Sequence, residues 1–178
     1  RRGIFGVVSV ATTTGFSTAD YGLWPTFVPF LLLMSAFIGA CAGSTGGGIK
    51  IIRLLLLFKQ GSREIKRLIH PNAVIPIKLG NKPVGSRVID AVWGFLAAYV
   101  LIFSILMLIC MALGEDPITA YSAVGASLNN LGPGLGDATL NYASLADGSK
   151  YVLAFAMLLG RLELFTLLVV LSPAFWER

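Results

Sequence analysis

The stretch Ala11-Thr12-Thr13-Thr14-Gly15-Phe16-Ser17-Thr18 places hydroxyl side chains and one glycine between two apolar segments. Such a run is typical of a Ser/Thr-rich turn, because hydroxyls bond nearby backbone and glycine supplies a positive φ. At membrane depth, however, irregular backbone is tolerated only where protein buries it or where it lines a watery cavity. Successive carbonyls can there replace the hydration shell of a cation. The stretch alone leaves both interpretations open.

Composition indicates a membrane protein. Of the 178 residues, 56% are hydrophobic and 13% are charged, and the mean hydropathy is +0.79; about a quarter of the residues of a soluble protein are charged. The net charge of +5 is concentrated in one connecting segment, which indicates membrane topology and not nucleic-acid binding. The chain starts at Arg1-Arg2 without an initiator methionine, so we expect it to be a fragment.

A glycine-rich break interrupts the long apolar segment from Thr26 to Phe58. It runs from Gly39 to Gly48 and includes three adjacent glycines, each of which costs a helix about 1 kcal/mol relative to alanine. We therefore predict a broken span with a helical half on each side. In lipid, the freed backbone must line a cavity or pack against protein.

The same glycines nearly match a nucleotide-binding P-loop, but the match fails. That motif requires lysine directly after the last glycine and Ser or Thr after the lysine. Here Ile49 separates Gly48 from Lys50, and Ile51 follows the lysine. Since the chain also lacks paired catalytic groups, we predict that it is not an enzyme and that it carries no cofactor.

The polar segment 59–87 carries half of the basic residues. The segment contains one acidic residue, Glu64. Its basic residues are Lys59, Arg63, Lys66, Arg67, Lys78, Lys82 and Arg87. The positive-inside rule therefore predicts a cytoplasmic connector. Its prolines suggest irregular structure after a short amphipathic helix.

The remainder of the chain contains a complete structural unit. Ala91 to Leu113 is long enough to span a membrane, Pro117 to Leu128 is predicted to be a half-helix, and Tyr151 to Ser172 is predicted to be a second span. Between the half-helix and the second span lies a polar, glycine-rich loop that starts at Asn129. This loop aligns with the first stretch, with Thr12 over Asn129 and Gly15 over Gly132, which indicates an internal repeat.

These units predict an all-α polytopic membrane protein built from span, re-entrant half-helix, loop and span. We assign residues 1–58 to the end of one repeat, 59–87 to the connector and 88–178 to a complete repeat. Because an ion path needs such loops on several sides, the parent protein is expected to have a fourfold pseudosymmetric pore. A non-conducting membrane assembly or structural subunit, whose glycines serve helix packing, is the alternative.

Four motifs in this order resemble the Trk/Ktr/HKT superfamily of potassium transporters. They are Thr12-Thr13-Thr14-Gly15-Phe16, the break Gly39–Gly48, Asn129-Asn130-Leu131-Gly132-Pro133 and Leu159-Gly160-Arg161-Leu162-Glu163. The resemblance covers essentially the whole chain and implies the last two of four repeats around one pore. It also implies a homodimer in the cell membrane, associated with cytoplasmic nucleotide-binding subunits of the TrkA type.

The resemblance further implies which residues meet potassium, the transported ion. The filter residues would be Thr12, Thr13, Thr14, Gly15, Asn129, Asn130, Leu131 and Gly132, with potassium bound there and no other metal site. Asn129, Asn130 and Leu131 replace hydroxyl residues, so this quadrant is expected to be less regular and less strictly selective than a potassium channel.

A gate is predicted on the cytoplasmic side of the filter. Its residues are Gly39, Gly43, Ser44, Thr45, Gly46, Gly47 and Gly48, whose small size lets the loop move, together with Arg161. A charge within a span costs about 2.5 to 3.5 kcal/mol, so Arg161 is expected to face the interior and bond freed carbonyls of the loop. The alternatives are a rigid kink for the glycines and a buried ion pair for Arg161.

Overall fold

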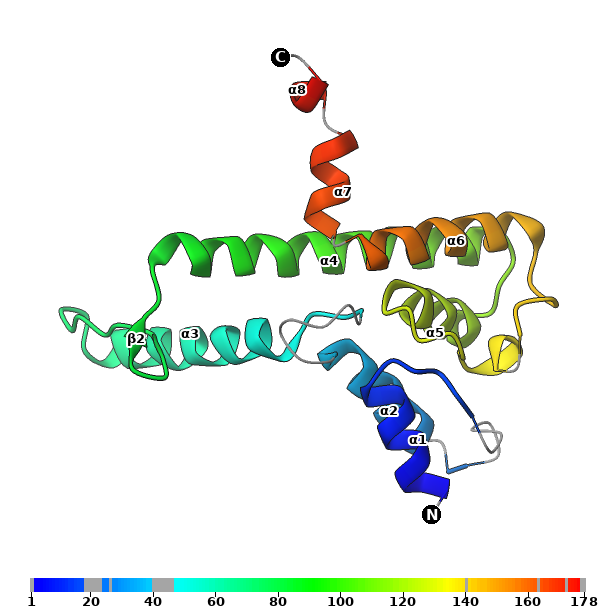
Figure 1. Cartoon of the computed structure of the whole chain (residues 1–178), viewed down its shortest axis with the longest axis horizontal. Helices are drawn as coiled ribbons and strands as arrows, with labels where there is room; N and C mark the ends of the chain where they lie inside the picture. Colours follow the sequence, from blue (N-terminus) through cyan, green and yellow to red (C-terminus); the bar gives the residue numbers. More distant parts are fainter. Residues whose placement is uncertain are drawn as a thin grey trace.

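The described part of the chain is mostly helical (Figure 1). A computed structural model describes residues 2–17, 24–25, 27–39, 47–139, 141–162, 164–171 and 173–176. The helices are α1 (Arg2–Ala11), α2 (Phe27–Ile38), α3 (Ile51–Ile69), α4 (Ser86–Ala112), α5 (Pro117–Leu128), α6 (Asp147–Arg161), α7 (Leu164–Leu171) and α8 (Pro173–Trp176). A 3₁₀ turn, η2 (Gly136–Ala138), follows α5, and a small antiparallel hairpin pairs β1 (Lys78–Leu79) with β2 (Lys82–Pro83).

Helix α4 is the central helix of the fold, because α3, α5, α6 and α7 all pack against it (Figure 1). Among the described helices, it alone is long and apolar enough to cross a membrane. One face buries Phe95, Tyr99, Leu106 and Cys110, while other positions expose large apolar side chains such as Leu101 and Leu108. An apolar face that no part of the described chain covers suits contact with lipid or with another part of a larger protein.

Helix α5 has the predicted bounds, Pro117–Leu128, and the sequence signals explain them. Asp116 accepts a hydrogen bond from the backbone N–H of Ile118 (3.1 Å), and Pro117 occupies the first helical position, where it needs no N–H donor. Small residues dominate the helix and let its neighbours approach closely. Its buried residues are Thr119, Ala120, Ser122, Ala123, Val124, Gly125, Ala126, Ser127 and Leu128.

The glycine-rich break lies where it was predicted, between the end of α2 at Ile38 and the start of α3 at Ile51. Gly39 and Gly48, at its two ends, have φ values of +70° and +88°, which glycine adopts without strain. Residues 40–46 lie outside the described residues. Helix α3 continues past Phe58 to Ile69, because no proline interrupts helix formation before Pro71.

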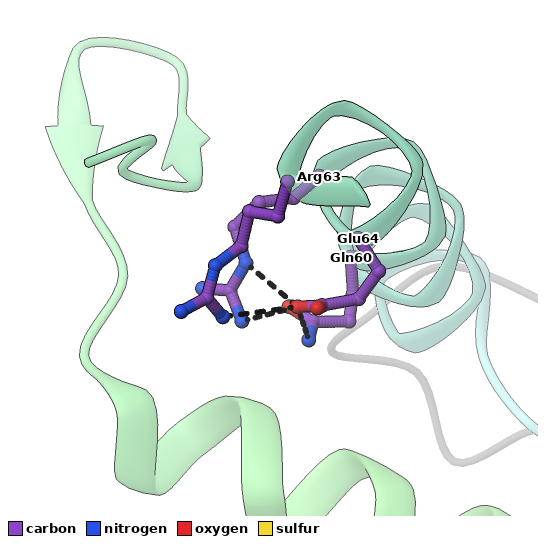
Figure 2. Close-up of polar contacts among 4 residues, drawn as sticks. Gln60, Arg63 and Glu64 are labelled. Carbon is purple, nitrogen blue, oxygen red and sulfur yellow. Dashed lines mark hydrogen bonds and ion pairs between the residues drawn. The ribbon is translucent and has the colours of Figure 1, made fainter. Parts of the chain in front are cut away.

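The amphipathic part of the connector is therefore continuous with the second half of the broken span. Glu64 accepts hydrogen bonds from Gln60 Nε2 (2.8 Å) and from Arg63 (3.1 Å), and it lies 3.6 Å from Arg67 (Figure 2). Exposed ion pairs of this kind contribute little to stability, and here they offset part of a strongly basic surface. Lys59 Nζ donates to the carbonyl of Lys78 (2.6 Å), which ties the helix to the hairpin.

The prediction of one continuous span from Tyr151 to Ser172 is wrong. Helix α6 ends at Arg161, and α7 starts at Leu164 and leaves in a different direction (Figure 1). The helix stops where the backbone of Gly160 meets the backbone of Leu128, and a basic residue suits the negative end of a helix. Helix α7 then packs on α4, where the Phe165 and Phe95 rings meet edge to face at 5.7 Å.

Replacement of Asp116 by alanine tests the start of α5. The change removes the acceptor for the Ile118 N–H, so we expect the free energy of unfolding to fall by about 1 kcal/mol. Thermal unfolding of the detergent-solubilised parent protein measures this. Asp116→Asn keeps an acceptor and should retain most of the stability; equal melting temperatures for both variants would contradict the capping role.

Candidate functional site

The first hydroxyl stretch begins as a capped helix end. Helix α1 closes with hydrogen bonds from the N–H of Thr13 to the carbonyl of Val10 (3.0 Å) and from the N–H of Thr14 to the carbonyl of Ser9 (2.9 Å). This pair of bonds defines a Schellman cap. Thr13 occupies the left-handed position with φ +54°, and Gly15 follows with φ +78°. The backbone beyond Thr13 is not helical.

The second loop repeats this cap and the two positive φ angles. The N–H of Asn130 donates to Ser127 (3.0 Å), and the N–H of Leu131 donates to Ala126 (2.8 Å). Asn130 has φ +52° and Gly132 has φ +100°. Two half-helices of unrelated side-chain sequence therefore end in the same cap, followed by the same pair of positive φ angles.

Thr13 is the unusual residue of the pair. Asparagine adopts the left-handed conformation readily, whereas a β-branched residue at positive φ is strained by about 1 to 3 kcal/mol. The hydroxyl of Thr12 bonds the carbonyl of Val8 (2.7 Å) and the hydroxyl of Thr14 (2.7 Å). These bonds hold the turn and compensate part of the strain.

The two loops meet directly. A Cβ atom on Gly15 would lie 2.0 Å from the carbonyl oxygen of Leu131 and 3.3 Å from Cδ of Pro133. Gly15 is therefore required both for its positive φ and for the close approach of the second loop. The carbonyl of Leu131 lies against the first loop.

The predicted gate residues Gly43, Ser44, Thr45 and Gly46 lie outside the described residues, but the end of the glycine-rich break is described. A Cβ on Gly47 would lie 2.1 Å from the carbonyl oxygen of Asn129, so the backbone there packs directly on the end of α5. Gly48 packs on Gly39, so the two described ends of the break lie against each other.

Gly160 approaches the end of α5 from another side. A Cβ on it would lie 2.0 Å from the carbonyl oxygen of Leu128. Arg161, the last residue of α6, follows Gly160 directly, and its side chain is exposed in the described part of the chain. The described end of the glycine-rich break, at Gly47, therefore contacts Asn129, the first residue of the second loop. Arg161 follows Gly160, which contacts Leu128, the residue just before that loop.

Asn129 has a structural partner that the sequence analysis did not identify. Its fully buried side chain accepts a hydrogen bond from the Tyr99 hydroxyl (2.8 Å) and donates to the carbonyl of Gly125 (2.8 Å). The side chain of Asn129 thus fixes α5 to α4, and only its backbone can contribute to a site. A tyrosine inside an apolar span needs a hydrogen-bond partner for its hydroxyl. The position of Tyr99 in the sequence could therefore have predicted that it bonds a polar side chain.

Further hydroxyl groups hold the two loops. Ser9 Oγ donates to the carbonyl of Phe16 (2.6 Å) in the first loop. In the second loop, Ser122 Oγ accepts from the N–H of Leu135 (2.8 Å), and the hydroxyl of Tyr142 donates to the carbonyl of Gly132. These residues were not predicted, because nothing in the local sequence relates a hydroxyl to a carbonyl seven or more residues away.

Comparison with known proteins identifies the family. The family model "TrkH: Cation transport protein" matches residues 1–178. The Trk system potassium uptake protein TrkH of Halomonas elongata is 54% identical over 178 residues, which are 100% of this chain and 37% of that protein. TrkH of Escherichia coli K12 is 58% identical over 173 residues, covering 97% of this chain and 36% of that protein.

The fold agrees with a solved structure of the same kind. The crystal structure of the potassium transporter TrkH from Vibrio parahaemolyticus superposes with a TM-score of 0.91 at 55% identity, covering 99% of this chain and 38% of that one. The chain thus spans a little over a third of the length of these relatives. It belongs to the TrkH family of cation transport proteins, within the superfamily that its motifs resemble.

Proposed function

We propose that the parent protein takes up potassium across the cell membrane and that this chain supplies two of four walls of its ion path. The observation that carries the proposal is the pair of half-helix ends with identical caps, whose loops meet where Gly15 faces the Leu131 carbonyl. Two copies of one backbone geometry, placed side by side, are what a pseudosymmetric ring of carbonyls requires. The potassium transport named for the relatives agrees with this assignment.

In this proposal the backbone coordinates the ion. The C-terminal ends of α1 and α5 are the negative ends of their helix dipoles, which favour a cation. Coordination comes mainly from the carbonyls of the two loops. The filter residues are Thr12, Thr13, Thr14 and Gly15 in the first loop and Asn129, Asn130, Leu131 and Gly132 in the second.

We propose that the break Gly39–Gly48 forms the gate and that Arg161 adds an electrostatic barrier beside it. The support is the packing of Gly47 and Gly160 on the last carbonyls of α5, which places both elements next to the second loop. Small residues have little bulk, so a loop made of them can leave the path, whereas a guanidinium stays charged at physiological pH.

The proposed setting is a multi-pass protein of the cell membrane with residues 59–87 in the cytoplasm. The basic surface of α3 and the hairpin supports that orientation. A homodimer and a TrkA-type nucleotide-binding subunit are the expected protein partners, and no nucleic acid is involved. A non-conducting assembly subunit remains the alternative, since close glycine contacts also serve helix packing. Potassium or rubidium uptake by proteoliposomes of the full-length parent, without nucleotide, distinguishes the two.

Gly15→Ser tests the filter. Any side chain here is strained at φ +78° and overlaps the Leu131 carbonyl, so the carbonyls must shift. We expect the preference for potassium over sodium to fall about tenfold, equivalent to about 1.4 kcal/mol. Gly3→Ser is the control, because nothing lies within 4 Å of a Cβ at Gly3. Unchanged selectivity in a normally expressed Gly15→Ser protein would refute the filter.

Shortening the glycine-rich break tests the gate. Deletion of Gly43 to Thr45 removes part of the proposed obstruction, so the initial rate of rubidium uptake should rise several-fold. Deletion within the hairpin turn at Gly80, which lies in the connector, should leave the rate unchanged. An unaltered or lower rate in a folded loop variant would favour a rigid kink.

Arg161→Gln tests the barrier. The change removes the charge but keeps hydrogen-bond donors, so potassium flux should increase and its dependence on ionic strength should weaken. Arg161→Lys keeps the charge and should stay close to the original rate. If the folded Gln variant transports at the original rate and affinity, Arg161 has no gating role.

A further inference from the structure

We propose that Tyr142 is a positioning residue that sets ion selectivity by holding the carbonyl of Gly132 in the second loop. The proposal rests on the proposed function, because it assigns a role within the same filter. Tyr142 is not part of either loop; it lies beyond η2, ten residues after Gly132. Its hydroxyl donates a hydrogen bond to the Gly132 carbonyl oxygen.

The Gly132 carbonyl has a special need for such a partner. The peptide between Gly132 and Pro133 has no N–H group, because proline lacks one. The carbonyl is therefore the only polar group by which that peptide can be fixed. A Cβ at Gly132 would meet open space, since nothing lies within 4 Å of it. The ring of Pro133 limits rotation of this peptide on one side, so the freedom that remains is at Gly132, whose φ is +100°. The hydrogen bond from Tyr142 restricts that remaining freedom.

Tyr142 itself is held firmly. Ser144 Oγ donates to the carbonyl of Asp137 (3.2 Å), and the N–H of Ala146 donates to Glu115 Oε1 (2.9 Å). Leu145 is buried in the main core, against which the Tyr142 ring also packs. The residues that directly follow Tyr142 are therefore anchored to other parts of the fold, as the support of a positioning group must be.

The hydroxyl also remains a donor. Burial raises the pKa of Tyr142 above its ordinary value near 10. The neutral form therefore predominates throughout the physiological range.

The effect of Tyr142 extends to the neighbouring carbonyl. Leu131 precedes Gly132, and its carbonyl lies against Gly15 of the first loop. Rotation of the Gly132 peptide would move this contact between the two loops. The first loop is held differently, since Ser9 Oγ bonds the carbonyl of Phe16 and the Gly15–Phe16 peptide retains its N–H.

Tyr142→Phe in the full-length parent protein tests the inference. The variant keeps the ring and removes only the hydroxyl. We expect potassium over sodium preference, measured from uptake in proteoliposomes, to fall about threefold to tenfold, the range of one net hydrogen bond. Potassium should also raise the melting temperature of the variant less than that of the unmodified protein, which needs no transport. Tyr151→Phe is the matched control, because that side chain is 79% exposed.

The outcomes separate the inference from the proposed function. If Tyr142→Phe lowers only the maximal rate, or changes nothing while Gly15→Ser reduces selectivity, Tyr142 is merely structural and the inference is wrong. If the unmodified parent transports no potassium, the proposed function fails and the inference fails with it. Should Tyr142→Phe not fold, Ser144→Ala loosens the same anchor and must lower selectivity in the same direction; unchanged selectivity there would also overturn the inference.

Discussion

The rest of this structure depends on the close packing of backbone at the C-terminal end of α5. The last carbonyls of a helix have no N–H partner within it, so they carry a concentrated negative charge. Gly47 and Gly160 approach the carbonyls of Asn129 and Leu128 so closely that neither position has room for a methyl group. These contacts fix where the segment before α3 and the end of α6 pass the end of α5.

Both long apolar segments break where they approach this helix end, although by different means. The first uses three adjacent glycines between α2 and α3, whereas the second ends α6 at Arg161 after a single glycine. Breaking a helix at membrane depth frees backbone groups that lipid cannot satisfy. Such breaks are tolerated where protein packs against them or where they line an aqueous cavity, and here Gly47 and Gly160 pack on the end of α5.

The sequence was sufficient to predict where a helix begins or ends when the signal lies in neighbouring residues. Asp116 and Pro117 mark the start of α5, and adjacent glycines mark the break after Ile38, so both were predicted correctly. The end of α6 at Arg161 was missed, because a single glycine in an apolar run is a weak local signal and the contact of Gly160 with Leu128 is a tertiary one. The bonds from Tyr99 to Asn129 and from Tyr142 to Gly132 join residues far apart in the chain, and no periodic pattern reports them.

The comparison of the two loops shows that one backbone geometry arises from different side chains. In the first loop, threonine hydroxyls brace a strained turn at Thr13; in the second, Asn130 adopts the same conformation without help. The Thr12 hydroxyl forms a hydrogen bond within its own loop, to Thr14, whereas the Asn129 side chain accepts one from Tyr99 in α4. What the two loops share is therefore the helix cap and the pair of positive φ angles that follows it. In the proposed filter, this shared backbone conformation would orient the carbonyls toward a cation, and it tolerates side-chain differences because each loop has its own anchor.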